Sequence, residues 1–122
     1  MQNIFGEKLR ALRLDAGLGL RELARHIDKS PGYISDVEHG RVKPPSEAII
    51  INISEILGVD KNELLTAAKK VDPEITGYVA EDPHVAEFLR MAKERDYKDG
   101  DWERLKQLAE IANLGGIKKE KQ

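Results

Sequence analysis

Residues 20–46 read LRELARHIDKSPGYISDVEHGRVKPPS and carry the strongest structural signal in the chain. A short helix is predicted over 20–27, because apolar residues recur at the spacing of one buried helical stripe: Leu20, Leu23, Ala24 and Ile27. A second helix is expected to begin at Ser30-Pro31, since serine supplies a capping oxygen and proline suits the first helical position. Gly40 is expected to end it, because glycine readily adopts a positive φ. The stretch therefore predicts two short helices joined by a turn of about four residues.

The flanking residues also favour helices, so the predicted fold class is all-α. Three further helices are expected in the first part of the chain: over 3–15, from Ser46 to about Leu57, and after Asp60. Each is bounded by a capping serine or aspartate, or by a terminal glycine. The apolar run 48–53 has a strand-like composition, but helix is favoured because its inward residues keep helical spacing: Ile50, Ile53 and Leu57.

The C-terminal part is expected to form a helical hairpin over residues 83–114, after a joint at 71–82 in which a short helix can form. Its two helices are predicted to begin at Pro83 and near Asp99. Because only about five residues connect them, they are expected to lie antiparallel. The inward residues are predicted to be Val85, Phe88, Leu89 and Ala92 in the first helix, and Trp102, Leu105, Leu108, Ala109 and Ala112 in the second. Residues 115–122 are expected to be a disordered basic tail.

Composition narrows the functional classes. The 122 residues include 40% hydrophobic and 34% charged residues and no cysteine, which excludes disulfides, thiolate metal sites and cysteine nucleophiles. No apolar run approaches the roughly 20 residues of a membrane helix, and no apolar signal segment follows Met1, so a cytoplasmic protein is expected. The net charge is -2, but residues 8–43 carry eight Lys/Arg against five acids, whereas residues 71–122 carry nine against twelve. The basic excess therefore lies in the first part of the chain.

No catalytic, metal or cofactor site is predicted. Ser35, Asp36 and His39 are the residue types of a hydrolytic triad, but their spacing on one short helix does not place a base between a nucleophile and an orienting acid. The three histidines are scattered, and the chain has no glycine-rich phosphate loop. An enzyme is therefore the least favoured class.

The chain resembles the Cro/CI-type (XRE) helix-turn-helix family of transcriptional regulators over residues 3 to about 70. The resemblance rests on several short motifs in order: Gly17-Leu18, Leu23-Ala24, Ser30-Pro31-Gly32-Tyr33-Ile34-Ser35, Glu38-x-Gly40, Pro45-Ser46, Leu57-Gly58-Val59 and Leu64-Leu65. It implies a five-helix, lambda-repressor-like DNA-binding domain over residues 1–70. It also implies a partner, double-stranded operator DNA, bound by a homodimer.

The resemblance implies that the helix beginning at Ser30 enters the major groove and that cations around it contact the DNA backbone. The candidate DNA-binding residues are Arg10, Arg21, Ser30, Pro31, Gly32, Tyr33, Ser35, Asp36, His39, Arg41 and Lys43. Pro31 and Gly32 offer no hydrogen-bonding fork to a base, whereas Asp36 can accept a hydrogen bond from cytosine N4. We expect loss of Arg41 to weaken binding to all sequences alike, and loss of Asp36 to change the preferred base. Ser30 has a second interpretation as a helix cap only, and Tyr33 one as a surface aromatic packed on the turn.

Two residues near the predicted interface, Leu20 and Arg13, are not expected to hydrogen-bond DNA. Gly19-Leu20 stands where the family often has a Ser or Thr cap followed by a polar residue, so Leu20 is not expected to hydrogen-bond phosphate. Arg13 is not assigned to DNA, because the resemblance places it against Glu38 as a structural ion pair. Breaking such a pair when it is buried costs about 3–5 kcal/mol.

The apolar side chains outside the inner stripes suggest a covered surface. Ile49, Ile51 and Ile56 lie outside the inner stripe, and Ile49 and Ile56, seven residues apart, form a second apolar stripe. In a lone helix-turn-helix domain these side chains are expected to be exposed, unless the hairpin or a second subunit covers them. The hairpin is therefore assigned to dimerisation or to a partner. The alternative function is an antitoxin-like or adaptor protein whose hairpin binds a protein, with DNA binding autoregulatory.

Overall fold

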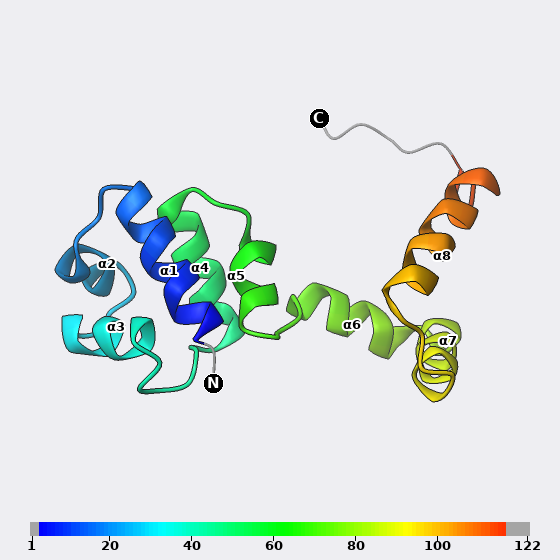
Figure 1. Ribbon diagram of the computed structural model, residues 1–122, viewed down its shortest axis with the longest axis horizontal. Helices are drawn as coiled ribbons and strands as arrows, with labels where there is room; N and C mark the ends of the chain where they lie inside the picture. The colour runs from blue at the N-terminus through cyan, green and yellow to red at the C-terminus, as the bar shows by residue number, and fades with distance from the viewer. Residues whose placement is uncertain (1–2, 117–122) are drawn as a thin grey trace. The chain divides into compact units, whose positions relative to one another are not determined.

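The computed structural model describes residues 3–116, and in this range it contains α-helices and no strand (Figure 1). The helices are α1 (Ile4–Asp15), α2 (Leu20–His26), α3 (Pro31–Glu38), α4 (Glu47–Leu57), α5 (Lys61–Ala67), α6 (Pro73–Glu81), α7 (Pro83–Glu94) and α8 (Asp99–Ile111). The all-α prediction is therefore confirmed. The chain divides into two compact units, one up to Tyr78 and one from Val79 onward.

The short helices of the first unit begin and end at the predicted capping residues. Ser30 Oγ accepts a hydrogen bond from the Tyr33 amide at 3.1 Å, and Ser46 Oγ accepts one from the Ile49 amide at 3.4 Å. Gly17, Gly40 and Gly58 follow helices and have φ near +70°. These backbone angles favour glycine and explain why the helices stop there.

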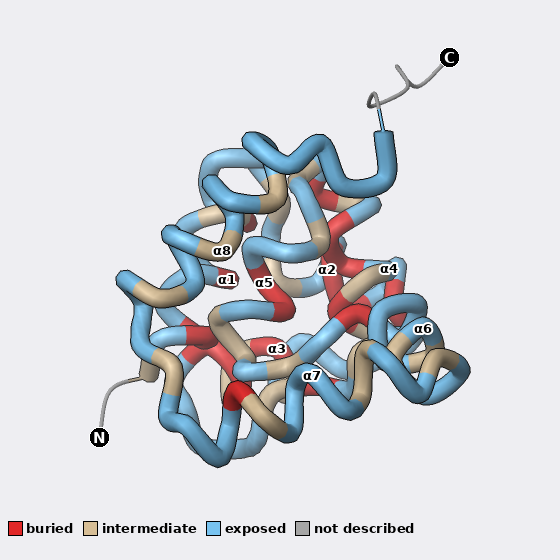
Figure 2. The backbone as a smooth tube through the Cα atoms, turned by 90° about the vertical axis from the view of Figure 1, so that its right-hand side faces the viewer, coloured by how far each residue is buried: buried red, intermediate tan, exposed pale blue. Residues whose placement is uncertain are grey.

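One hydrophobic core fills the first unit, and Figure 2 shows it as the buried segments of α1 to α5. The predicted inward residues of α2, α3 and α4 are in it, except Leu20, which is half-buried and packs against it. The core also contains Phe5, which the sequence pattern did not single out. The expectation that Ile49, Ile51 and Ile56 would be exposed is wrong. They are half-buried and pack against the core. The reason is that α4 contacts both α2 and α5, so more than one of its faces is covered within the unit.

The predicted joint contains α6. Its first turn is fixed by Asp72, which accepts a hydrogen bond from the Glu74 amide at 3.0 Å and pairs with Lys61 Nζ of α5 at 2.6 Å. Asp72 is buried, whereas Ile75 and Tyr78 of α6 are more than half exposed. The start of α6 is therefore tied to the first unit by a specific polar contact.

In the second unit the two predicted helices are present, but they are not antiparallel. Figure 1 views α7 nearly along its axis while α8 lies across the view, so the helices cross steeply. The Tyr97 ring lies between them, with its centre 6.3 Å from that of Phe88 and 5.4 Å from that of Trp102, both edge to face. This aromatic contact joins the two helices near their connection.

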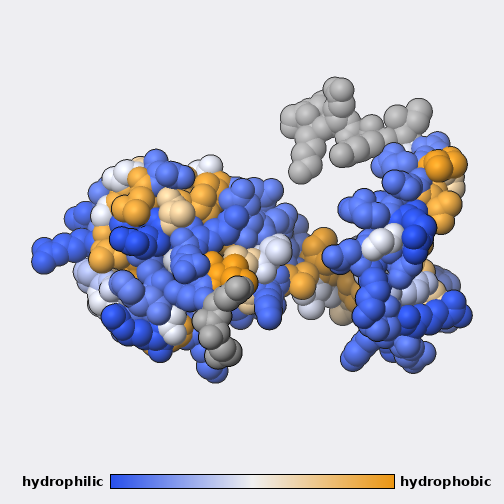
Figure 3. All heavy atoms as spheres, viewed as in Figure 1, coloured by the Kyte–Doolittle hydropathy of each residue, from blue (hydrophilic) through white to orange (hydrophobic). Residues whose placement is uncertain are grey.

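The predicted inward faces of α7 and α8 are mostly solvent-exposed. Within residues 79–116, Ala92 is the only buried residue. Phe88, Leu89 and Trp102 are 37 to 39% exposed, and Leu108 is 59% exposed. The prediction that these four side chains point into a hairpin core is therefore wrong within a single copy. Figure 3 shows apolar surface in orange at the end of α8, where Ile111 and Leu114 are exposed. The tail predicted at 115–122 lies outside the described residues from 117 onward. No helix in the described range has the length and apolar character to cross a membrane.

Candidate nucleic-acid interface

The candidate recognition helix α3 is held against α1 and α2 by one face. Ile34, Val37 and Glu38 are buried on that face. Pro31 and Gly32 in the first turn and His39 after the last turn are exposed, and the other candidate residues of α3 are half-buried. The helix thus presents its first turn and one polar side to solvent, as the sequence predicted.

An ion pair at the back of α3 fixes its orientation. Arg13 of α1 donates two hydrogen bonds to Glu38, Nε to Oε2 at 2.6 Å and Nη2 to Oε1 at 2.9 Å. Its Nη1 donates to the Leu18 carbonyl at 2.9 Å. Both side chains are nearly completely buried, and the hydrogen bond with Glu38 raises the pKa of Arg13. The pair is structural, as the resemblance implied.

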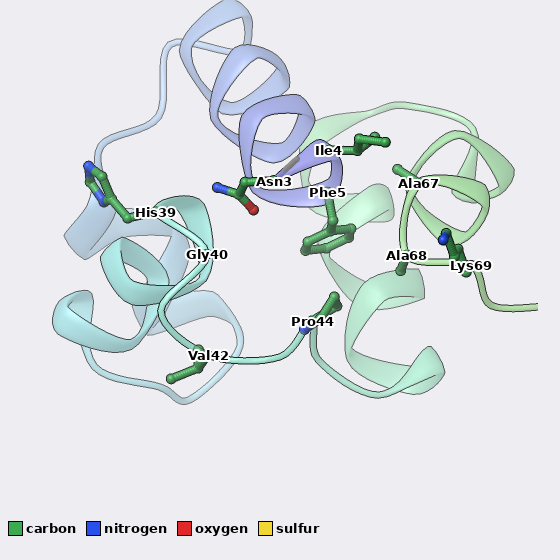
Figure 4. Close-up of a pocket in the computed structure, with 10 residues that line it drawn as sticks. All are labelled: Asn3, Ile4, Phe5, His39, Gly40, Val42, Pro44, Ala67, Ala68 and Lys69. Carbon is green, nitrogen blue, oxygen red and sulfur yellow. The ribbon is translucent and has the colours of Figure 1, made fainter. Parts of the chain in front are cut away.

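A second contact behind α3 was missed from the sequence. Asn3 Nδ2 donates to the Glu38 carbonyl at 2.6 Å, while Asn3 Oδ1 accepts from the Gly6 amide at 3.3 Å. A Cβ atom on Gly6 would lie 2.5 Å from the carbonyl oxygens of Val37 and Glu38, so only glycine fits there. Figure 4 shows the Asn3 side chain between α1 and Gly40. An asparagine just before a helix was the available signal, since it is a common N-cap.

At the start of α3, Ser30 and Tyr33 have structural contacts. Ser30 caps the helix, and Lys29 Nζ lies 5.6 Å from the centre of the Tyr33 ring. Tyr33 is half-buried, and burial raises the pKa of its hydroxyl. Tyr33 therefore packs on the turn and also keeps part of its surface toward solvent.

Further along α3, polar side chains are joined in pairs. His39 Nδ1 lies 2.8 Å from the Ser35 carbonyl oxygen and 3.5 Å from Ser35 Oγ. Because a carbonyl only accepts, Nδ1 must be the donor to it. Asp36 Oδ1 accepts from Arg41 Nη1 at 3.2 Å. Because a backbone carbonyl engages the imidazole and an arginine engages Asp36, these residues do not form a hydrolytic relay.

The remaining candidates are exposed. Arg10, Arg21 and Lys43 have no carboxylate within 4 Å in the described part of the chain.

At the start of α2, Gly19 provides no side-chain cap, and Leu20 packs against the core. The hydrophobic contact of Leu20 thus takes the place of a polar group at this position.

An open depression of about 600 Å³ lies beside the loop that follows α3 (Figure 4). It is lined by parts of α1, this loop and the end of α5, and its apolar residues include Ile4, Phe5, Val42, Pro44 and Ala68. Of the candidate DNA-binding residues, only His39 lines it. Among the candidate residues, the depression therefore adjoins α3 only at His39.

Comparison with known proteins agrees with this geometry. Residues 4–67 match the family model described as "Helix-turn-helix domain". The HTH-type transcriptional regulator RamB of Mycobacterium tuberculosis is 31% identical over 93 residues, which are 69% of this chain and 19% of RamB. The transcriptional regulator ClgR of M. tuberculosis is 37% identical over 49 residues, 40% of this chain and 44% of ClgR. The chain thus spans about a fifth of the length of RamB and less than half of that of ClgR.

Solved structures were also found. A crystal structure of the clp gene regulator ClgR from Corynebacterium glutamicum matches with a TM-score of 0.49 and 30% identity, covering 76% of this chain and 90% of that one. A chain of the SinR protein/SinI protein complex matches with a TM-score of 0.48 and 18% identity, covering 89% of this chain and 97% of that one. On the family match, which covers more than half of the sequence, the chain belongs to the helix-turn-helix domain family, of the Cro/CI type that its motifs resemble.

Proposed function

We propose that this protein is a cytoplasmic repressor that binds an inverted-repeat operator as a homodimer, with α3 of each copy in a major groove. The observation that carries the proposal is the way α3 is held. Arg13 and Asn3 donate hydrogen bonds to Glu38 at the back of the helix, while the first turn of α3 is exposed to solvent. A recognition helix needs this combination, because base contacts require a rigid helix that projects from its domain.

In this proposal, cations supply affinity and α3 supplies sequence preference. Arg10, Arg21, Arg41 and Lys43 are exposed and would contact phosphates, which carry no sequence information but set the salt dependence. The exposed and half-buried side chains of α3 would face the base edges. The cap Ser30 would lie beside the DNA backbone.

The second unit supports the dimer. A helix in water is stabilised mainly by packing of its apolar face, yet α7 and α8 bury only Ala92 within one copy. Phe88, Trp102 and Leu108 lie on the surface that remains. A second copy burying this surface would link two α3 helices, so that half-site centres lie about 10–10.5 base pairs apart, or a multiple of that distance.

The same surface favours the second candidate function, an antitoxin-like or adaptor protein. An exposed apolar face can also receive a different protein, and residues 71–122 have three more acids than Lys/Arg. In that case DNA binding would serve autoregulation. The two functions differ in whether the partner of α7 and α8 is a second copy of this chain.

The first test is selection of bound sequences from a random duplex library by the full chain at near-physiological salt. Enrichment of an inverted repeat would support a dimeric, sequence-specific regulator. Enrichment of a single half-site would contradict the dimer but keep DNA recognition. Absence of any enriched sequence, with a folded protein, would contradict DNA recognition by α3 and favour the protein-partner function.

A further inference from the structure

The backbone after α3 turns back on the helix and places Arg41 beside Asp36. The Gly40 amide donates to the Val37 carbonyl at 3.1 Å, and the Arg41 amide donates to the Asp36 carbonyl at 2.8 Å. With Gly40 at φ +73°, these bonds form a Schellman motif. A Cβ atom at Gly40 would also lie 2.9 Å from Asn3 Cγ, so the turn depends on glycine.

The side chains at this turn depart from the usual pattern. In a Schellman motif an apolar contact commonly joins the two residues linked by the outer backbone bond. Here those residues are Asp36 and Arg41, and an ion pair of 3.2 Å joins them. Their side chains are 44% and 61% exposed, on a surface where an ion pair adds little to stability. Stability therefore does not account for the pair, and a role in binding a ligand explains it better.

We propose that Asp36 and Arg41 form one recognition unit, in which Arg41 neutralises and orients the Asp36 carboxylate so that it accepts a hydrogen bond from a cytosine amino group. This inference rests on the proposed function. Asp36 is the acidic group on the outer side of α3, and the usual base partner of a carboxylate in the major groove is the amino group N4 of cytosine. Alone, it would be repelled by the phosphates that line the groove. Arg41, held beside it by the turn, offsets that repulsion.

The ion pair changes what is expected of Arg41. From the sequence, loss of Arg41 weakens binding to every duplex alike. If the two residues act together, loss of Arg41 instead weakens the operator more than a random duplex, because only the operator complex inserts Asp36 fully among the bases. It follows that the variant lacking both Asp36 and Arg41 regains part of the operator affinity that is lost when Arg41 alone is removed.

The test is a double-mutant cycle on the full chain with Asp36→Ala, Arg41→Ala and the double variant. Affinity is measured for the selected operator, for operators with the cytosine replaced, and for a random duplex. We expect Asp36→Ala to lose a discrimination of about 5- to 150-fold at one cytosine. We also expect Arg41→Ala to weaken operator binding more in the wild-type background than in the Asp36→Ala background. The two factors of weakening should differ by about threefold or more.

The matched control is the partly exposed ion pair of 3.3 Å between Glu47, the first residue of α4, and Lys70, which follows α5. The same cycle with Glu47→Ala and Lys70→Ala is expected to leave operator preference unchanged. Equal effects of Arg41→Ala in both backgrounds, or an unchanged base preference in Asp36→Ala, would overturn the inference while operator binding by the wild type stands. A folded wild-type protein that binds no duplex would overturn the proposed function and this inference with it.

Discussion

Arg13 and Glu38 are joined by two parallel hydrogen bonds of 2.6 and 2.9 Å, in which both side chains are almost fully buried. The pair links the last turn of α1 to the last residue of α3. Because a planar guanidinium matches a carboxylate with two donors, the contact fixes both distance and direction. It therefore sets how far α3 projects from the domain.

We expect Glu38→Ala to destabilise the protein by about 3–5 kcal/mol, because it leaves the Arg13 charge buried without its partner. The measurement is urea denaturation of the full chain followed by circular dichroism. Glu47→Ala is the control, since it breaks a partly exposed pair and is expected to change stability much less. Similar small losses in both variants would show that the buried pair does not support the fold.

Gly6 gives a test of the close approach between α1 and α3. In Gly6→Ala the new methyl group would meet two backbone oxygens at 2.5 Å, and backbone cannot swing aside as a flexible side chain can. We expect a loss of about 1–3 kcal/mol in the free energy of unfolding. Gly77→Ala is the matched control, because Gly77 is also helical but its Cβ would meet nothing within 4 Å. That variant is expected to gain about 0.5–1 kcal/mol. A neutral Gly6→Ala would show that α1 and α3 are farther apart.

These two contacts mark what sequence patterns reveal of the site. The Arg13–Glu38 pair follows from the family resemblance, and the ends of α3 follow from the local chemistry of Ser30 and Gly40. Contacts of Gly6 were not predictable, since periodicity says which face of a helix is buried but not how closely two backbones approach. The Asp36–Arg41 pair was missed because their approach depends on the turn between them.

The C-terminal unit shows a different limit. A short connection predicts neighbouring helices, but the angle between α7 and α8 depends on how the Tyr97 ring packs against Phe88 and Trp102. Apolar spacing likewise predicted that Leu108 would be buried, and in one copy it is exposed. A helical stripe identifies a face that needs a partner and does not say whether the partner belongs to the same chain.

Ser30 allows a cap to be separated from a DNA contact. Ser30→Ala and Ser46→Ala each remove one capping hydrogen bond, so each is expected to cost about 1 kcal/mol of stability. Only Ser30→Ala is expected to weaken operator binding further, by about 2- to 12-fold for one lost hydrogen bond. Fluorescence anisotropy with the operator measures the difference. Equal affinities of the two variants would leave Ser30 as a cap alone.

Asp72 predicts a pH dependence at the start of α6. The hydrogen bonds from Lys61 and from the Glu74 amide hold the pKa of Asp72 below its ordinary value. The charged form is thus favoured in the folded state. Its contribution to stability is present above the ordinary aspartate pKa of about 3.9 and is lost as the pH falls through the lowered value.

We therefore expect Asp72→Asn to melt at a lower temperature than the wild type at pH 7, with the difference disappearing in acid. Thermal melts from pH 7 to pH 2 measure it. Asp28→Asn is the control, because Asp28 is an exposed residue with φ +57° that asparagine also adopts. Its melting curve is expected to follow that of the wild type throughout. A constant difference for Asp72→Asn at every pH would show that the charge of Asp72 does not stabilise the fold.

Leu108 tests whether α8 joins two copies. It is 59% exposed in one copy, so Leu108→Asp is expected to leave the folded unit intact but to place a charge inside a dimer interface. Sedimentation velocity of the full chain should show a dimer for the wild type and a monomer for the variant. Operator affinity should fall with it, because two linked α3 helices bind more tightly than one. Gln107→Asp adds the same charge at the neighbouring exposed position and is expected to remain dimeric. If the wild type is monomeric and still selects a single half-site, no second copy covers the apolar face of α8. That face would then be assigned to binding a different protein.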